Sequence, residues 1–210
     1  GYNGSLSTGP LNDEIRTQVG EAFARRLYRE RCVSVLNRGH PFIRPVVPAA
    51  KKIGETFFVD LAAGEAAYNR GLSHSHLDSL RQLRRADIRL EHDRELRHVE
   101  DFHRLYTETM RRLDAQQEYF LSLDYIRNLL SHPEFGGELR LAWAGDRLLA
   151  GVVFLRKGKL AHYHLSASER TATKLPVTKL ILDDFIRSEI RDGRCDRLHL
   201  GGGLGGASDS

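Results

Sequence analysis

The sequence predicts an α/β (α+β) protein in which a mixed β-sheet is flanked by helices. Short turns that contain glycine separate three apolar segments, which predict antiparallel strands at 138–144, 147–156 and 159–165. A helical pattern over 177–192 ends at Gly193 and leads into a further strand at 197–200. This last connection is long enough for a crossover between parallel strands.

Upstream of this region, apolar residues at helical spacing alternate with segments that are typical of strands. The predicted helices cover 12–31, 64–72, 75–86, 98–113 and 122–132. The predicted strands cover 33–38, 55–61 and 86–92. Asn12 or Asp13 is the expected N-cap of the first helix, and Pro133 is expected to follow the end of the last one.

Composition limits the classes of protein that this chain can belong to. Its 210 residues are 40% hydrophobic, which is enough to bury a core in one large or two small domains. The sequence contains no apolar run near the ~20 residues of a membrane span. The only two cysteines, Cys32 and Cys195, lack the spacing of metal ligands, so we expect reduced thiols and a cytoplasmic location.

The chain ends predict an internal piece of a longer protein. It begins without Met and stops just after a strand of core type. We expect 1–60 to be the end of a preceding domain, 61–86 a helical connection and 87–210 a second domain.

The predicted crossover places a working region near 164–176 and 199–203, because ligands bind beyond the carboxyl ends of parallel strands and at helix N-termini. Strand alternation puts His162, His164 and Ser166 on one face and Tyr163 with Leu165 on the other. This polar face either contacts substrate or is half exposed on a structural strand. Two histidines with no nearby carboxylate or thiol do not predict a metal site.

Two histidines are the catalytic candidates, since the pKa of imidazole lies near neutrality. His164 lies on the polar strand face, and His199 precedes a run of glycines. His199 either positions substrate and moves a proton or is a buried structural histidine. The backbone of Gly201, Gly202 and Gly203 either binds an anion or carbonyl oxygen or forms a mobile loop.

Arginines concentrate in 81–97, where Arg81, Arg84 and Arg85 have the side chains that suit phosphate. The alternative is a solvated helix face. Four acidic residues lie in the same segment and no aromatic residue interrupts it, so we do not expect DNA binding.

Several motifs in one order resemble a known family. They are TFFVDL at 56–61, RxxRR at 81–85, LYTETM at 105–110, LLAGVVFL at 148–155, YHLSAS at 163–168 and LHLGGGLGGASDS at 198–210. Together they resemble the FemAB-like branch of the GNAT acyltransferase superfamily. The resemblance implies a tandem of GNAT-like domains, of which this chain would contain the end of the first and most of the second.

The resemblance also implies a reaction, in which an acyl or aminoacyl group is transferred to an amine. The donor would be acyl-CoA or aminoacyl-tRNA, with no permanently bound cofactor. The acceptor would be a small molecule or a muropeptide, and a lipid-linked acceptor would bring the protein to the membrane surface. Tyr163, Ser166 and Asp209 of the matching motifs would contact substrate. The alternative is a GNAT-shaped module without catalysis that binds an anionic ligand or a partner protein.

The segment that would hold the donor phosphates departs from the usual GNAT pattern. Residues 169–179 contain no glycine, although glycines allow a backbone to approach phosphate closely. Lys174 and Lys179 either meet phosphate near the start of the predicted helix or are surface lysines.

Overall fold

The computed structural model describes residues 12–35, 42, 55–169 and 176–202. The chain falls into two compact units, of which the larger spans Phe57–Gly203. This larger unit contains the sheet, and the smaller one contains the helix α1 (Asp13–Arg29). The strand predicted at 55–61 therefore belongs to the same compact unit as the strands that follow it.

Helix α1 begins where the sequence predicts, because Asn12 caps it. The Asn12 side chain accepts a hydrogen bond of 2.8 Å from the backbone N–H of Ile15. After this helix, 33–35 form no strand. The strand predicted at 33–38 is therefore wrong for these three residues, and its remainder lies outside the described part of the chain.

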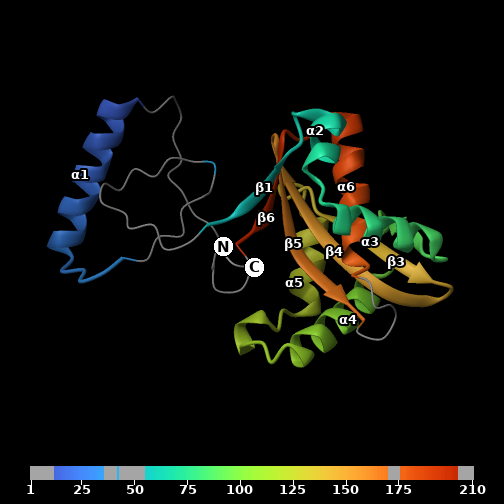
Figure 1. Cartoon of the computed structure of the whole chain (residues 1–210). Helices are drawn as coiled ribbons and strands as arrows, with labels where there is room; N and C mark the ends of the chain where they lie inside the picture. Colours follow the sequence, from blue (N-terminus) through green and yellow to red (C-terminus); the bar gives the residue numbers. More distant parts are fainter. Residues whose placement is uncertain (1–11, 36–41, 43–54, 170–175, 203–210) are drawn as a thin grey trace. The chain divides into compact units, whose positions relative to one another are not determined.

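A six-stranded sheet forms the centre of the larger unit (Figure 1). Its strands in chain order are β1 (Phe57–Asp60), β2 (Arg89–His92), β3 (Glu138–Ala144), β4 (Arg147–Lys157), β5 (Leu160–Ser168) and β6 (Arg197–Gly201). They are arranged in the order β1-β6-β5-β4-β3-β2. Only β5 and β6 are parallel, which confirms the predicted antiparallel meander followed by a crossover.

Helices cover both faces of this sheet (Figure 1). One face carries α4 (Val99–Arg112) and α5 (Leu123–Ser131), which are separated by a 3₁₀ turn at Gln117–Tyr119. The other carries α2 (Gly64–Gly71), α3 (His74–Arg85) and α6 (Thr178–Asp192). Side-chain caps fix two of the starts: Ser73 accepts from the N–H of His76, and Ser122 accepts from that of Tyr125.

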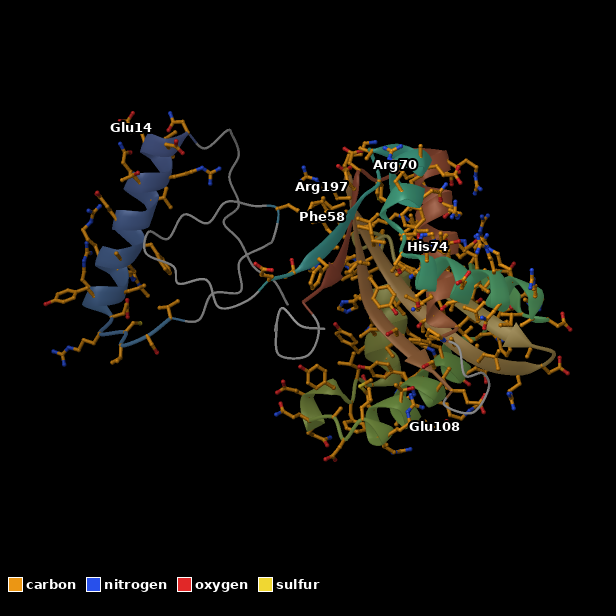
Figure 2. The ribbon with its side chains drawn as sticks, viewed as in Figure 1. Glu14, Phe58, Arg70, His74, Glu108 and Arg197 are labelled. Carbon is orange, nitrogen blue, oxygen red and sulfur yellow. The ribbon has the colours of Figure 1, made fainter. Side chains whose placement is uncertain are left out.

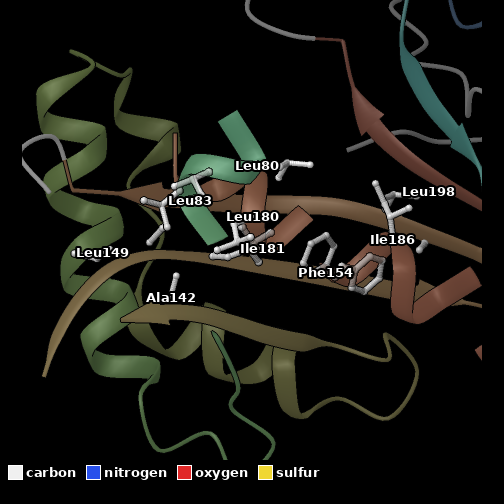
Figure 3. Packing of buried hydrophobic residues seen from close by; sticks show 14 of the residues in the cluster. Leu80, Leu83, Ala142, Leu149, Phe154, Leu180, Ile181, Ile186 and Leu198 are labelled. Carbon is white, nitrogen blue, oxygen red and sulfur yellow. The ribbon is translucent and has the colours of Figure 1, made fainter. Parts of the chain in front are cut away.

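The core on the α6 face joins α3 and α6 to the central strands (Figure 3). Leu80 and Leu83 of α3 pack with Ile181 of α6, and all three are at most 2% exposed. Phe154 of β4 stacks on Phe185 of α6 with ring centroids 3.7 Å apart. Burying each such side chain contributes about 1.5–3 kcal/mol, so these contacts hold α6 beside the sheet.

The core on the α4 face requires a glycine on β4. A Cβ atom added at Gly151 would lie 2.5 Å from Cδ2 of Phe102 and 3.0 Å from Cδ2 of Leu141. Helix α4 therefore approaches the sheet at a point where only glycine leaves room for the Phe102 ring. None of the described helices is long and apolar enough to cross a membrane.

Candidate acyl-transfer site

The two parallel strands separate partway along their length. Strands β5 and β6 share register from Leu160 opposite Arg197 to His162 opposite His199. Beyond this point β5 continues to Ser168 and β6 to Gly201, but these residues of the two strands are not paired with each other. We call this region the strand split, and it coincides with the working region that the sequence predicts.

A bulge in β5 lies at the start of the strand split. Tyr163 is opposite Phe154 of β4, whereas Leu165 is opposite Val153, so His164 is an extra residue in the pairing. The bulge changes which residues share a face. Ser166 lies on the α6 face with Tyr163, and its predicted place beside His162 and His164 is wrong.

The β5–β6 register and the bulge together place three imidazole rings in one cluster. The ring centroids of His162 and His164 are 5.3 Å apart, and those of His162 and His199 are 5.0 Å apart. Both predicted catalytic histidines are therefore in one cluster. His162, which the sequence analysis placed on the same face without assigning it a role, is the central member.

Burial affects the protonation of His164 within this cluster. His199 is only 5% exposed, and burial lowers the pKa of His164 below its usual value of 6.5. Nε2 of His164 is buried and has no hydrogen-bond partner among the residues that the structure describes. A neutral imidazole with a free ring nitrogen is the form that accepts a proton.

On the α6 face, β5 is tied to the start of the crossover helix. Burial raises the pKa of Tyr163, and hydrogen bonds with Ser166 and Thr178 act in the opposite direction. Thr178 is the first residue of α6, and the helix N-cap makes no side-chain hydrogen bond there. Lys179 follows in the same turn. The pKa of His76 on α3 is lowered mainly by burial and, to a smaller extent, by the charge of Lys179.

The predicted arginines of α3 are distributed differently. Arg84 donates to Asp183 of α6 at 2.7 Å, and Arg81 pairs with Asp78 one turn away at 2.8 Å. Arg85 is exposed at the last position of α3. Arg84 therefore connects two helices of the core, while Arg81 pairs within its own helix.

The remaining predicted residues lie at the edge of the described chain. Gly201 has a φ of 89°, a backbone conformation that favours glycine, and Gly202 is half-buried. Lys174, Gly203 and Asp209 are outside the described residues. No group of three His, Cys, Asp or Glu side chains in the described part of the chain is arranged to hold a metal ion.

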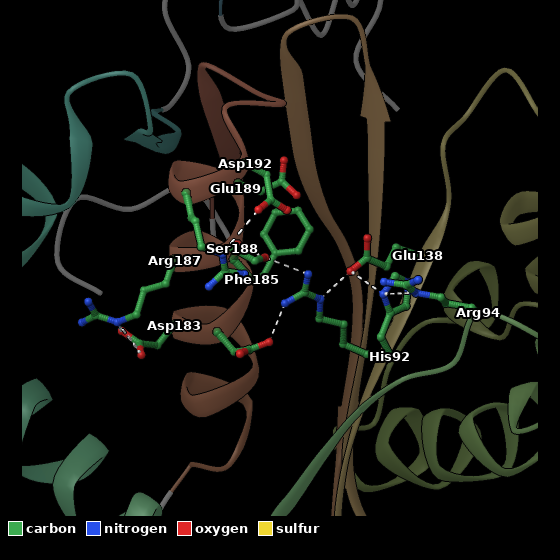
Figure 4. Close-up of polar contacts among 12 residues, drawn as sticks. His92, Arg94, Glu138, Asp183, Phe185, Arg187, Ser188, Glu189 and Asp192 are labelled. Carbon is green, nitrogen blue, oxygen red and sulfur yellow. Dashed lines mark hydrogen bonds and ion pairs between the residues drawn. The ribbon is translucent and has the colours of Figure 1, made fainter.

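A network of charged residues joins α6 to β3 and β4 (Figure 4). Arg156 of β4 donates to Glu189, which is fully buried, at 2.8 Å and also pairs with Glu138 of β3. Arg140 joins Glu138, and its other end donates to Ser188 at 2.8 Å. Sequence periodicity gave no sign of this network, because charged side chains are ordinarily solvated and their pairing here depends on contacts between β3, β4 and α6.

Comparisons with known proteins agree with this geometry. Residues 77–207, more than half of the chain, match the family described as an acetyltransferase (GNAT) domain. A search of curated proteins gives no match.

Solved structures with a similar fold include FemX and the L-PGS of Bacillus licheniformis. FemX has a TM-score of 0.60 and 12% identity over 74% of this chain and 55% of its own. L-PGS has a TM-score of 0.51 and 13% identity over 76% of this chain and 51% of its own. The C-terminal domain of a putative lysylphosphatidylglycerol synthetase from Agrobacterium fabrum has a TM-score of 0.54 and 15% identity, covering 72% and 47%.

This chain thus spans about half the length of the structures that it resembles. At such low identities the likeness shows a shared fold, while the family match rests on the sequence itself. The chain belongs to the GNAT acetyltransferase domain family, and its fold is similar to those of FemX and L-PGS.

Proposed function

We propose that this chain carries the transfer site of an N-acyltransferase, with the reacting groups held at the strand split. The observation that carries the proposal is the end of β5–β6 pairing at His162 and His199, directly beside the bulge at His164. Separated parallel strands present backbone groups that no neighbouring strand uses. These groups can hold a donor and orient its carbonyl.

The reaction needs few protein groups. The acceptor amine attacks the donor carbonyl, a backbone N–H at the strand split stabilises the oxyanion, and the donor leaves as a thiolate or alkoxide that then takes up a proton. The neutral imidazole of His164 takes the proton that the amine loses. His162 lies next to His164, and His199 lies next to His162, so the three rings form a path along which a proton can leave.

Acyl-CoA is the donor that we propose first, because the family match is to an acetyltransferase domain. Its phosphates would lie near the start of α6, where the helix dipole and Lys179 favour an anion. Aminoacyl-tRNA is the second donor, since 169–179 lacks the glycines that suit CoA phosphates. The proposed acceptor is a small-molecule amine or a muropeptide, and a lipid-linked muropeptide would place the protein at a membrane surface.

The test is acyl transfer by the intact protein with acetyl-CoA, longer acyl-CoA and charged tRNA as separate donors. Acceptors should include an amino sugar and a muropeptide with a free amine. We expect His164→Gln to lower kcat about 10²-fold, in the range of a lost general base. The variant should also lose the increase of rate with pH that a neutral imidazole produces.

The control is His74→Gln, because His74 is exposed at the start of α3 (Figure 2). It belongs to a helix, whereas the three clustered histidines belong to β5 and β6. Its rate should equal that of the unchanged protein. Normal transfer by His164→Gln would contradict the role of this residue. Failure of the unchanged protein to use any donor, together with binding of an anionic ligand, would favour a module without catalysis.

A further inference from the structure

A pocket lies on the α4 face of the sheet, and none of the three histidines at the strand split lines it. Residues of α4 and of the β3–β4 hairpin line this pocket of about 500 Å³. Its apolar lining consists of Leu105, Trp143 and Leu148. We call it the hairpin pocket, and its volume is in the range of small-molecule sites. Glu169, at the end of β5, is the lining residue nearest in sequence to the proposed transfer site.

Trp143 gives the hairpin pocket an unsatisfied hydrogen-bond donor. The side chain is 6% exposed, and its indole N–H has no partner in the described part of the chain. The His98 ring packs edge-on against it with centroids 4.9 Å apart, and the guanidinium of Arg89 lies 5.6 Å from the indole ring. Since Arg89 is 60% exposed, its displacement would open the indole to an acceptor group.

The arginines around the hairpin pocket are already paired. Arg89 binds Glu91 at 2.7 Å, Arg104 binds Asp101 at 2.8 Å, and Arg147 binds Glu169 at 3.2 Å. These pairs leave the arginines with further N–H groups for a ligand, but without a net positive charge to attract an anion.

Two lining carboxylates differ from the paired ones. Among the described side chains, none pairs with Glu108 of α4 or with Asp146 of the hairpin turn, and both line the pocket. Figure 2 shows Glu108 on α4, at the end of the sheet where β5 stops. The hairpin pocket therefore combines uncompensated negative charge with an apolar floor and an indole donor.

We propose that the hairpin pocket binds a primary ammonium group next to a carbonyl or carboxylate, as in a free amino acid or the first residue of a short peptide. The ammonium group lies between Glu108 and Asp146, where charge-assisted hydrogen bonds hold it. The carbonyl or carboxylate oxygen accepts from the Trp143 indole and from the spare N–H groups of Arg147. This site is separate from the transfer site and does not depend on catalysis.

The chain offers a direct probe, because Trp143 is its only tryptophan. The intact protein is titrated with L-alanine and L-alanyl-L-alanine while the Trp143 fluorescence is recorded. We expect a saturable change with at least one of them, and the tighter ligand identifies the source as free amino acid or peptide. Glu108→Gln should raise Kd about tenfold, a loss of about 1.4 kcal/mol, since it removes a charge-assisted hydrogen bond to the ammonium group.

Three controls make the result decisive. Glu118→Gln, at an exposed acid outside the hairpin pocket, should leave Kd unchanged. N-acetyl-L-alanine lacks the ammonium group and should not bind; equal binding would overturn the proposal. A saturable response to inorganic phosphate without any to L-alanine would also overturn it. The proposal would likewise fall if neither L-alanine nor L-alanyl-L-alanine gave a saturable response. Because the readout is binding, these results are independent of whether the protein transfers an acyl group.

Discussion

Gly151 is a single residue whose lack of a side chain sets the spacing between α4 and the sheet. It lies on β4 under α4, in contact with the fully buried Phe102 ring. Neither the ring nor the strand backbone has free space around it, so an added methyl group must displace one of them.

We expect Gly151→Ala to lower the free energy of unfolding by about 1–3 kcal/mol, the usual cost of overpacking a core. Urea denaturation followed by circular dichroism measures it. Gly71→Ala is the matched control, because an added Cβ at Gly71 meets nothing within 4 Å. Equal stability of the two variants would show that α4 can move away from the sheet at little cost.

At the scale of elements, α6 is tied to β3 and β4 by ionic groups as well as by apolar contacts. Burial alone would raise the pKa of Glu138, but the charges of Arg140 and Arg156 outweigh it and lower the pKa below its usual 4.5. A carboxylate with a depressed pKa in the folded state adds stability above its unfolded pKa. That stability is lost as the pH falls through the folded value.

The unchanged protein should therefore lose stability progressively below about pH 4.5, and Glu138→Gln should flatten this part of the profile. At pH 7 the same variant should cost about 3 kcal/mol, because Arg140 and Arg156 each lose a buried carboxylate and keep only Asp184 and Glu189, respectively. Urea midpoints measured from pH 3 to 7 test both expectations. An unaltered slope in Glu138→Gln would mean that other carboxylates cause the loss.

The elements themselves were predictable because their signals are local. The segment 138–144 is bounded as predicted, and the caps at Asn12 and Ser122 make the hydrogen bonds that their residue types suggest. The bulge at His164 was not predictable, because the alternation from His162 to Ser166 looks regular in sequence. It depends on how β5 pairs with β4, which is a contact between strands.

At the scale of the whole molecule, the candidate site was also predictable only in part. The crossover predicted that His164 and His199 lie near the ends of parallel strands, and the two residues do join one cluster. The central place of His162 follows only from the register between β5 and β6. Likewise, the pairing of Arg84 with Asp183 requires two helices about 100 residues apart to meet, so the sequence suggested a ligand instead.

One sheet serves two cores in this molecule, and its strands contribute side chains to both. Leu141 and Trp143 of β3 pack on the α4 face, whereas Ala142 between them packs on the α6 face. Because the same strands contribute to both cores, the sheet cannot unfold on one face and stay folded on the other. We therefore expect the larger unit to unfold in one transition.

Asp183 allows this expectation to be tested from the face opposite Trp143. It is 2% exposed and binds Arg84 at 2.7 Å, Arg187 at 3.0 Å and the hydroxyl of Tyr68 at 3.1 Å. Asp183→Asn should lower stability by about 2–4 kcal/mol, whereas Asp78→Asn, which removes an exposed pair, should cost less than about 1 kcal/mol. If the sheet couples the two cores, Trp143 fluorescence and circular dichroism will shift to the same lower urea midpoint. A Trp143 midpoint that stays in place while the circular dichroism midpoint falls would show that the α4 and α6 faces unfold separately.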